Sequence, residues 1–250
     1  MKRKEQMLQS GSFKKNDKIL GITGGVGAGK STILSYLKEA YGAVVIEADA
    51  VGHQVQQPGE PCFKEIVDVF GTEILNKSGA IDRGKLGAIV YADRKKMNQL
   101  NAIVHPAIKK RILEEIDCMA DLSSNDLPSK SNLSEGFQSE DPQPGDKSRK
   151  LVVIEAALLL EDHYDEFCEE VWYIYADEQT RMKRLMSSRG YSREKVLQIM
   201  GNQLSEDEFR RRCDAVIDNS GTDVRMTYTE IDRMLREKNE RKEFCDFKKG

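Results

Sequence analysis

The segment GGVGAGKST at residues 24–32 constrains the fold more than any other part of this chain. It fits the spacing G-x-x-x-x-G-K-[ST], with Gly24, Gly29, Lys30 and Ser31 at the fixed positions. Glycines let the backbone turn sharply and bring successive N–H groups close to an anion, and a following helix N-terminus favours the same charge. Because the apolar run KILGIT precedes the segment and a helical pattern follows it, we expect a strand, a loop that binds a nucleoside triphosphate, and a helix.

Two side chains of this segment have expected roles beyond the backbone. Lys30 would neutralise oxygens of the β- and γ-phosphates, and Ser31 would supply an oxygen ligand to Mg²⁺. The alternative is a glycine-rich turn without a ligand, but the flanking strand and helix are the context that the motif requires.

Composition narrows the remaining classes of protein. A chain of 250 residues is long enough for one sizeable domain, and its formal charge of −3 argues against nucleic acid as the main partner. The five cysteines form no C-x-x-C pair and the three histidines lie far apart, so we expect neither disulfides nor a structural zinc. No apolar run approaches membrane-spanning length and the basic N-terminus lacks a signal-peptide core, which favours a cytoplasmic protein without membrane contact.

Short runs rich in β-branched residues predict the strands of a parallel sheet. They are almost continuously apolar, as strands covered on both faces are, and helical patterns separate them. We therefore expect an α/β fold with a doubly wound parallel sheet flanked by helices and a ligand at the carboxyl ends of the strands. The predicted strands are residues 18–23, 43–46, 151–155, 171–175 and 215–217.

The helical region between the second and third strands is longer than one crossover needs, which predicts a helical substrate-binding subdomain. A Ser-, Pro-, Asp- and Gly-rich stretch then predicts a polar surface insertion. The full expectation is a flexible extension at 1–17 and a nucleotide-binding P-loop domain at 18–250, with core 18–50, 150–178 and 213–250, helical subdomain 51–120, insertion 121–149 and lid 179–212.

Carboxylates follow two of these strands. A phosphoryl-transfer enzyme needs a carboxylate near the phosphate loop, to position Mg²⁺ or to accept a proton from the acceptor hydroxyl. Asp49 follows the second strand and Glu155 ends the third, and we expect both strands to neighbour the strand before the phosphate loop. Plain surface or helix-capping carboxylates are the alternative.

Basic residues gather in RMKRLMSSRGYSREK at 181–195, which contains one acid, Glu194. Such a cluster inside an acidic protein, broken at Ser187–Gly190, suggests a lid over phosphates, because arginine suits bidentate oxygen contacts. A solvated helix face is the alternative. The arginines at 210–212 follow a capping box of Ser205 and Glu208 and are explained by the helix dipole alone.

Taken in order, these motifs resemble the dephospho-CoA kinase family over roughly residues 18–235, apart from the insertion. The phosphate loop is shared by many families, so the resemblance depends on the series that follows it. That series is Glu47-Ala48-Asp49, Pro58-Gly59, Phe70-Gly71, Gly79, Asp82-Arg83, Leu86-Gly87, His105-Pro106, Arg184 in the lid, and Asp214-Ala215-Val216-Ile217-Asp218-Asn219-Ser220-Gly221.

The resemblance implies a P-loop kinase fold and ATP-dependent phosphorylation of the ribose 3′-hydroxyl of dephospho-CoA. Small-molecule substrates, ATP with Mg²⁺ and dephospho-CoA, are the partners it implies. It places Asp49 and Lys30 in catalysis, Arg184 at the lid, Asn219 near adenine, and Asp49, Arg83 and His105 on the acceptor side. The ATP-binding stretch that it implies is Gly27, Ala28, Gly29, Lys30, Ser31 and Thr32.

Two departures from the family pattern stand out. The family usually has Asp-Ala-Asp where this chain has Glu47-Ala48-Asp49, and an Asp with Pro-Leu-Leu where this chain has Glu155-Ala156-Ala157-Leu158-Leu159. Neither removes the aspartate that matches the catalytic position.

Three other readings stay open at this point. A nucleoside monophosphate kinase would phosphorylate AMP or UMP and not dephospho-CoA. A GTP-dependent switch commonly has an N-K-x-D loop, and Asn76-Lys77-Ser78-Gly79 lacks its aspartate. A non-catalytic ATP-binding protein would not need Asp49 or the lid.

Overall fold

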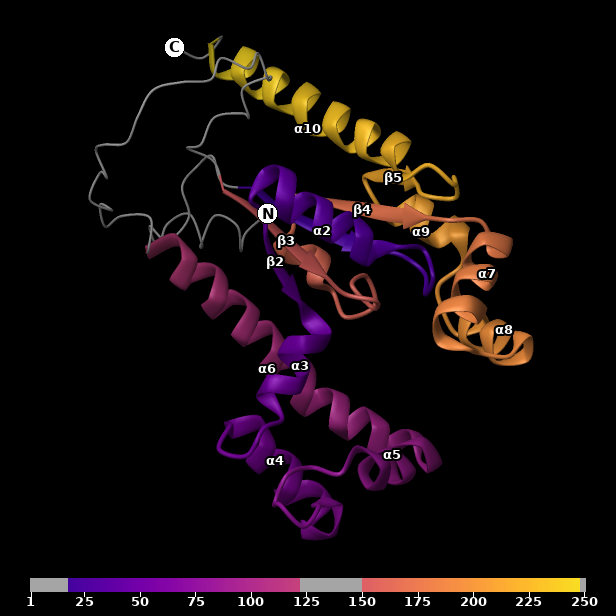
Figure 1. Cartoon of the computed structure of the whole chain (residues 1–250). Coiled ribbons are helices and arrows are strands. Elements are labelled where there is room, and N and C mark those ends of the chain that lie inside the picture. Colours follow the sequence, from indigo (N-terminus) through magenta and orange to yellow (C-terminus); the bar gives the residue numbers. More distant parts are fainter. Residues whose placement is uncertain (1–17, 122–149, 248–250) are drawn as a thin grey trace, which may run out of the picture. The chain divides into compact units, whose positions relative to one another are not determined.

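The structure is a computed structural model that describes residues 18–121 and 150–247 (Figure 1). The predicted extension at 1–17 and residues 122–149 of the predicted insertion lie outside the described residues. The described chain divides into two compact units. Among the described residues, unit 1 contains Lys18, 46–121 and 150–152, and unit 2 contains 19–45 and 153–247.

Five strands form one parallel sheet, which confirms the predicted fold class. They are β1 (Lys18–Thr23), β2 (Val44–Glu47), β3 (Leu151–Glu155), β4 (Glu170–Tyr175) and β5 (Ala215–Asp218). Each was expected within two residues of these bounds. The inner strands are almost entirely buried, because helices cover the sheet and a continuous apolar run serves both of its faces.

The order β2-β3-β1-β4-β5 corrects one expectation. We expected β2 and β3 both to neighbour β1, but β3 lies between β2 and β1. Strands are about 4.8 Å apart and a helix is about 10 Å wide, so the helix that joins β1 to β2 covers two strand spacings and leaves room for β3. Local sequence patterns do not distinguish these two orders.

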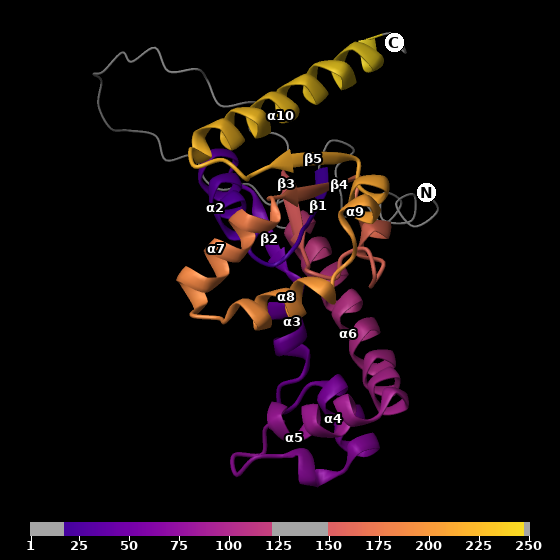
Figure 2. The ribbon, with the colours of Figure 1, turned by 90° about the vertical axis from the view of Figure 1, so that its right-hand side faces the viewer.

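The helices of unit 2 that carry or support the phosphate loop come from both ends of the chain. They are α2 (Lys30–Tyr41), α7 (Glu178–Arg189), α8 (Arg193–Gly201), α9 (Glu206–Arg212) and α10 (Val224–Phe247), with a short 3-10 turn at Tyr164–Phe167. Figure 2 shows α7 and α8 as consecutive helices below α2. The predicted break between them lies at Gly190, which ends α7 with a φ of 62°. The capping box of Ser205 and Glu208 at the start of α9 is also confirmed.

Helix α2 is fixed against α10 by a cluster of tyrosines. The hydroxyls of Tyr36 and Tyr41 both donate to Asp232 Oδ1 at 2.6 Å, and the rings of Tyr36 and Tyr228 stack at 3.9 Å. Burial and the Asp232 carboxylate raise the pKa of Tyr36 to about 12. Tyr41 is 37% exposed, although it lies on the same face of α2 as the buried Leu37. Its ring meets the Tyr36 ring edge-on, and it reaches α10 through its hydroxyl.

Unit 1 is built from helices. They are α3 (Ala48–Val55), α4 (Pro61–Phe70), α5 (Arg83–Ala92) and α6 (Arg94–Asp121), with a 3-10 turn at Thr72–Ile74. Val104, Ile108, Ile112 and Ile116 recur every four residues along α6 and are buried, as the apolar pattern predicts. Gly52 lets α3 approach α6 closely, because a Cβ there would stand 3.1 Å from Ile108 Cδ1.

Helix α6 continues through Pro106, which lies inside a helix of 28 residues, so His105 does not begin a helix there. His105 is half-buried, which fits the other interpretation of its sequence context, a packed residue before a proline. A proline in a helix interior removes one hydrogen bond, here the one to the carbonyl of Ala102. Buried Val104 before the proline and buried Ile108 after it hold the helix together across that missing bond.

The stretch Asn76-Lys77-Ser78-Gly79 forms a tight turn. Asn76 Oδ1 accepts hydrogen bonds from the backbone N–H groups of Ser78 and Ala80 and from the Ser78 hydroxyl. The Asn76 side chain is therefore used by its own turn, as is common for Asn in turns. This arrangement gives a structural reason for the Asn-Lys pair and weakens the GTP-switch reading.

Within the described residues, no helix is both long and apolar enough to cross a membrane.

Candidate active site

The loop between β1 and α2 has a backbone that side chains other than glycine would obstruct. Gly29 has a φ of 88° and immediately precedes α2, and a Cβ on it would collide with Nδ2 of Asn219. A Cβ on Gly24 would collide with the carbonyl oxygen of Ile174 in β4. Glycine is therefore required where the loop leaves the sheet and where it enters the helix.

The carbonyl groups of the loop are hydrogen-bonded. Lys30 Nζ donates to Gly24 O at 2.9 Å, and the Ala28 N–H donates to Gly25 O at 3.1 Å. The Arg181 side chain donates to Val26 O at 2.9 Å, and the Thr32 N–H donates to Gly29 O at 3.1 Å.

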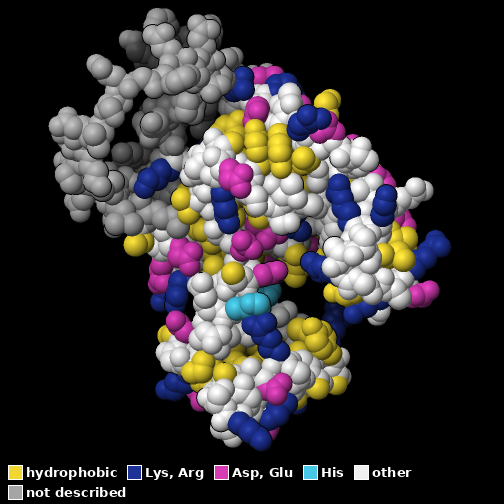
Figure 3. Space-filling model, in the orientation of Figure 1, with side chains coloured by type: hydrophobic (Ala, Val, Ile, Leu, Met, Phe, Trp, Pro, Cys, Tyr) yellow, Lys and Arg dark blue, Asp and Glu magenta, His cyan; other side chains and the backbone are white. Residues whose placement is uncertain are grey.

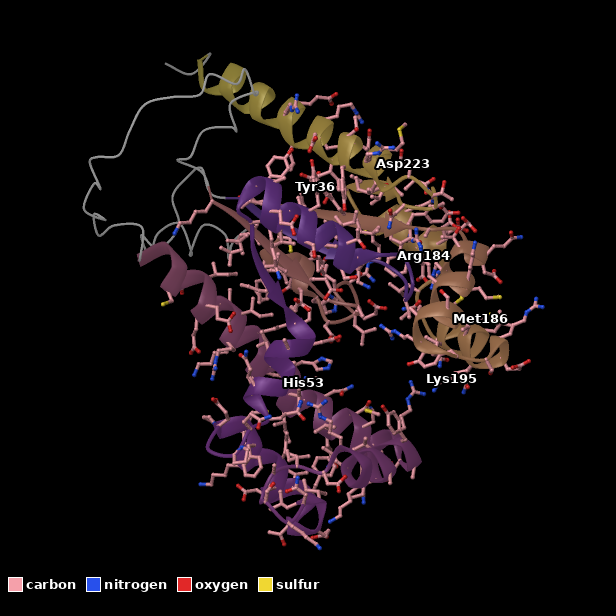
Figure 4. The ribbon with its side chains drawn as sticks, viewed as in Figure 1. Tyr36, His53, Arg184, Met186, Lys195 and Asp223 are labelled. Atoms are coloured by element: carbon pink, nitrogen blue, oxygen red, sulfur yellow. The ribbon has the colours of Figure 1, made fainter. Side chains whose placement is uncertain are left out.

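Arg184 and Asn219 hold the remaining carbonyls. Arg184 Nη1 lies 3.2 Å from Ala28 O and 3.5 Å from Gly27 O, and Asn219 Nδ2 donates to Ala28 O at 2.8 Å. Figure 4 labels Arg184 on α7. Arg184 Nη2 also donates to the carbonyl of Asn219 at 2.9 Å, so the two residues that bond to the loop are bonded to each other.

Several N–H groups of the loop are left over. In the described part of the chain, the amides of Gly27, Gly29, Lys30 and Ser31 have no hydrogen-bond acceptor. A loop that turns its carbonyls toward protein donors and leaves its amides free presents positive partial charge to its open side. This pattern of bonded carbonyls and free amides is suited to an anion, as the phosphate loop predicted from the sequence requires.

Lys30 is positioned by two oxygens. Its Nζ lies 2.9 Å from Gly24 O and 3.5 Å from Glu155 Oε1. The side chains of Lys30 and Glu155 are largely buried, with 15% and 12% of their surfaces exposed. Glu155 ends β3, so the carboxyl end of the strand beside β1 brings an acid to the lysine of the motif. Ser31 and Thr32 are exposed in the first turn of α2.

Asn219 has a place that sequence did not anticipate. It was predicted near adenine, and it is 3% exposed with its amide nitrogen on Ala28 O and its Oδ1 3.2 Å from the Thr227 hydroxyl. Both polar atoms of its side chain therefore face protein groups. Its contact with adenine stays a prediction, and support of the loop is what its geometry provides.

Unit 1 holds the remaining predicted site residues. Asp49 lies in the first turn of α3 and Arg83 is the first residue of α5, which Asp82 caps by accepting from the N–H groups of Gly84 and Lys85. Asp49 and Arg83 are both exposed and have no hydrogen bond or ion pair to other described residues. His105 is half-buried on α6.

The structure thus brings Gly27–Thr32, Arg184 and Asn219 together in unit 2, and leaves Asp49, Arg83 and His105 on separate helices of unit 1. A cavity of about 310 Å³ also lies in unit 1, between the end of α3, the start of α4 and the middle of α6. None of the three predicted acceptor-side residues lines it.

Two functional candidates were missed because nothing local marks them. The sequence indicates Arg181 only as one of the basic residues at 181–195, and no sequence pattern indicates Gln203. Both bond to the loop at Val26, which is distant from them in sequence. Burial lowers the pKa of the Arg181 guanidinium, because the apolar surroundings disfavour its charge.

No group of three or more His, Cys, Asp or Glu residues that could hold a metal ion occurs among residues 18–121 and 150–247. Mg²⁺ usually keeps several waters and takes only one or two protein oxygens together with phosphates. The exposed Ser31 hydroxyl and the Glu155 carboxylate are the oxygens that unit 2 offers beside Lys30.

Comparisons with known proteins identify the family of this chain. The family model described as Dephospho-CoA kinase matches residues 18–127 and 140–224. A dephospho-CoA kinase from Geobacter sulfurreducens is 37% identical over 204 residues, which cover 82% of this chain and 90% of the relative. Another from Oceanobacillus iheyensis is 34% identical over 221 residues, which cover 88% of this chain and 98% of the relative.

Solved structures share the fold. The crystal structure of TT1252 from Thermus thermophilus superimposes with a TM-score of 0.66 and 27% identity, over 89% of this chain and 98% of the other. A dephospho-CoA kinase from Campylobacter jejuni has a TM-score of 0.59 at 22% identity, over 88% of this chain and 98% of the other. At that identity the second likeness speaks for the fold alone.

Proposed function

We infer that this chain, which belongs to the dephospho-CoA kinase family, transfers the γ-phosphoryl group of ATP to the ribose 3′-hydroxyl of dephospho-CoA, giving coenzyme A and ADP. The observation that carries the phosphoryl-transfer chemistry is the loop at 24–31, whose carbonyls are bonded to protein donors while four amides are left free. The identity of the acceptor, dephospho-CoA, is inferred from family membership.

On the ATP side, the free amides of the loop and the start of α2 would bind the phosphates, and Lys30 would neutralise charge that develops between the β- and γ-phosphates. Lys30 is prepared for this role because Gly24 O and Glu155 already hold its Nζ at the loop. A pre-placed charge reorganises little during the reaction, which is why such groups stabilise a transition state well.

We propose Ser31 as the protein ligand of Mg²⁺, and Glu155 as the carboxylate that acts on it through water. When bound with the nucleotide, Mg²⁺ neutralises phosphate charge and favours the transfer. The protein's own part is to orient the phosphates and hold the lysine, as the contacts above support.

On the acceptor side, we propose that Asp49 accepts the proton of the acceptor hydroxyl or orients that hydroxyl for attack. A ribose hydroxyl is hardly ionised near neutral pH, so its proton must be removed as the new bond to phosphorus forms. Asp49 is exposed and its carboxylate has no bond to another described residue, so it is free for a substrate. Arg83 and His105 are proposed to bind dephospho-CoA, and Arg184 and Asn219 to serve the ATP side.

We also propose that the partners are limited to these small molecules and that the protein works in the cytoplasm. The acidic net charge supports the absence of a nucleic-acid partner. On the face seen in Figure 3, basic and acidic side chains of the described residues are interspersed and form no continuous basic band.

An acceptor panel tests the proposal. Purified protein with ATP and Mg²⁺ is given dephospho-CoA, AMP or UMP in turn, and ADP and the phosphorylated product are followed by chromatography with mass detection. We expect product with dephospho-CoA and none with the two nucleotides, and a much lower rate when GTP replaces ATP. Product from AMP or UMP but not from dephospho-CoA would overturn the assignment.

A further inference from the structure

Val26, in the middle of the phosphate loop, has both of its backbone groups bonded to side chains from elsewhere in unit 2. Its N–H donates to Gln203 Oε1 at 3.1 Å, and its carbonyl accepts from Arg181 Nε at 2.9 Å. Arg181 Nη2 in turn donates to the same Gln203 oxygen at 2.7 Å. The three bonds close a ring around one residue of the loop.

Arg181 comes from α7 and lies flat against the loop. A Cβ on Gly25 would collide with its guanidinium group, so the glycine at that position makes room for the arginine. Its two bonds come from adjacent nitrogens of one planar group and go to different residues, a geometry that the single ammonium of lysine cannot reproduce.

Gln203 lies between α8 and α9. Its oxygen faces an N–H group of Val26 and an N–H group of Arg181, and both are donors. Only an acceptor satisfies that pair, and the side chain is partly buried, so water does not readily replace it.

We propose that Arg181 and Gln203 are positioning residues for nucleotide binding, which hold the Val26 backbone and thereby keep the free amides of Gly27 and Gly29 oriented for phosphate. The inference rests on the proposed binding of ATP by this loop. Neither residue needs to touch the nucleotide: they act through the loop. A loop already fixed loses less conformational freedom when it binds, so its affinity is higher.

The test compares three variants of the full chain. Gln203→Leu removes the acceptor at nearly the same size, Gln203→Glu keeps it, and Gln198→Leu makes the same change at an exposed glutamine of α8. We expect Gln203→Leu to weaken ATP binding measured by calorimetry about tenfold, which corresponds to about 1.4 kcal/mol. Gln203→Glu should stay within about threefold of the parent, and Gln198→Leu should match the parent.

Two further readouts separate positioning from a general structural role. The rate at saturating ATP should change less than about threefold in Gln203→Leu, so that the loss falls on KM for ATP and not on kcat. Hydrogen exchange of the Val26 amide, followed by NMR, should become faster in Gln203→Leu and return toward the parent rate in Gln203→Glu. Unchanged ATP affinity in Gln203→Leu, or a loss that Gln203→Glu shares equally, would overturn the inference.

If Gln203→Leu does not fold, Arg181→Lys carries the test. It keeps the charge and loses the paired geometry, and we expect ATP binding to weaken severalfold with the melting temperature within a few degrees of the parent. An ATP affinity equal to that of the parent would refute the role of Arg181. A parent protein that binds ATP but does not phosphorylate dephospho-CoA would instead refute the proposed acceptor and leave this inference standing.

Discussion

The two units of this chain present their predicted site residues in opposite ways. In unit 2, side chains from α2, α7, the end of β5 and the segment before α9 donate to or accept from the backbone of the phosphate loop. The amides of Gly27, Gly29, Lys30 and Ser31 have no acceptor among the described residues. In unit 1, Asp49 and Arg83 extend from helix starts with no partner among the described residues. Phosphate binding is built in advance, whereas the acceptor side offers free side chains to a substrate.

This contrast predicts that substitutions in the two units impair different properties of the enzyme. Changes at the loop should disturb a network and affect ATP first, and changes in unit 1 should remove one function and leave the rest of the unit unaltered. The predictions below follow from the largest expected effect to the smallest.

Replacing Lys30 by alanine should produce the largest effect. The variant loses the charge on the β- and γ-phosphates, and it also leaves Gly24 O and Glu155 without their cation. We expect turnover to fall by at least about 10³-fold, measured by ADP release with dephospho-CoA. Lys38→Ala on the exposed face of the same helix is the control and should keep normal turnover. Near-normal turnover of Lys30→Ala would end the phosphate-loop reading.

Replacing Asp49 by asparagine should reduce turnover by ~10²–10⁴-fold, the usual range for loss of a general base. The shape of the side chain is kept, and the carboxylate has no partner in the described structure to lose, so the melting temperature and ATP affinity should be unchanged. Single-turnover rates and binding of both substrates measure this. Asp68→Asn, an exposed acid on α4, is the matched control. If acceptor binding is lost while the rate of the bound complex is normal, Asp49 is a binding residue.

Replacing Asn219 by alanine tests whether this residue supports the loop or recognises the adenine base. The change removes the bond to Ala28 O and leaves a buried carbonyl with only Arg184 as its donor, so we expect ATP binding to weaken by about tenfold. If the residue supports the loop, binding of ATP and of GTP should weaken by the same factor in a titration with each. A loss confined to ATP would instead place the side chain at adenine.

Deleting residues 124–146 should have the smallest effect. These residues lie outside the described structure, their sequence is polar, and the family model leaves residues 128–139 among them unmatched. We expect kcat, KM for both substrates and the melting temperature to stay near those of the full chain. A melting temperature lowered by more than a few degrees would show that the segment packs against the domain.

Sequence predicted what depends on neighbouring residues. The strand positions, the capping box at Ser205 and the strand, loop and helix around the motif at 24–32 are all set within a few residues, and the structure confirms them. The helical region between β2 and β3 was predicted for the same reason, because the apolar period of a helix is local.

What the sequence did not reveal depends on pairing between distant segments. The position of β3 between β1 and β2 follows from how the sheet assembles, and α6 runs through Pro106 because packing of its isoleucines overrides a local helix breaker. Asn219, Arg181 and Gln203 reach the loop only in the folded chain, and no spacing in the sequence indicates that an amide at 203 faces residue 26.

The long range of these contacts has a consequence for how the protein is made. The loop is encoded near the start of the chain, yet the partners of Val26 and Ala28 lie 177 and 191 residues further on. A growing chain leaves the ribosome N-terminus first, so the loop is outside long before the residues that hold it. We therefore expect nucleotide affinity to appear late and abruptly, when residue 219 has emerged. Ribosome-bound chains arrested before and after that point would show this by ATP capture, and strong capture by the shorter chain would contradict it.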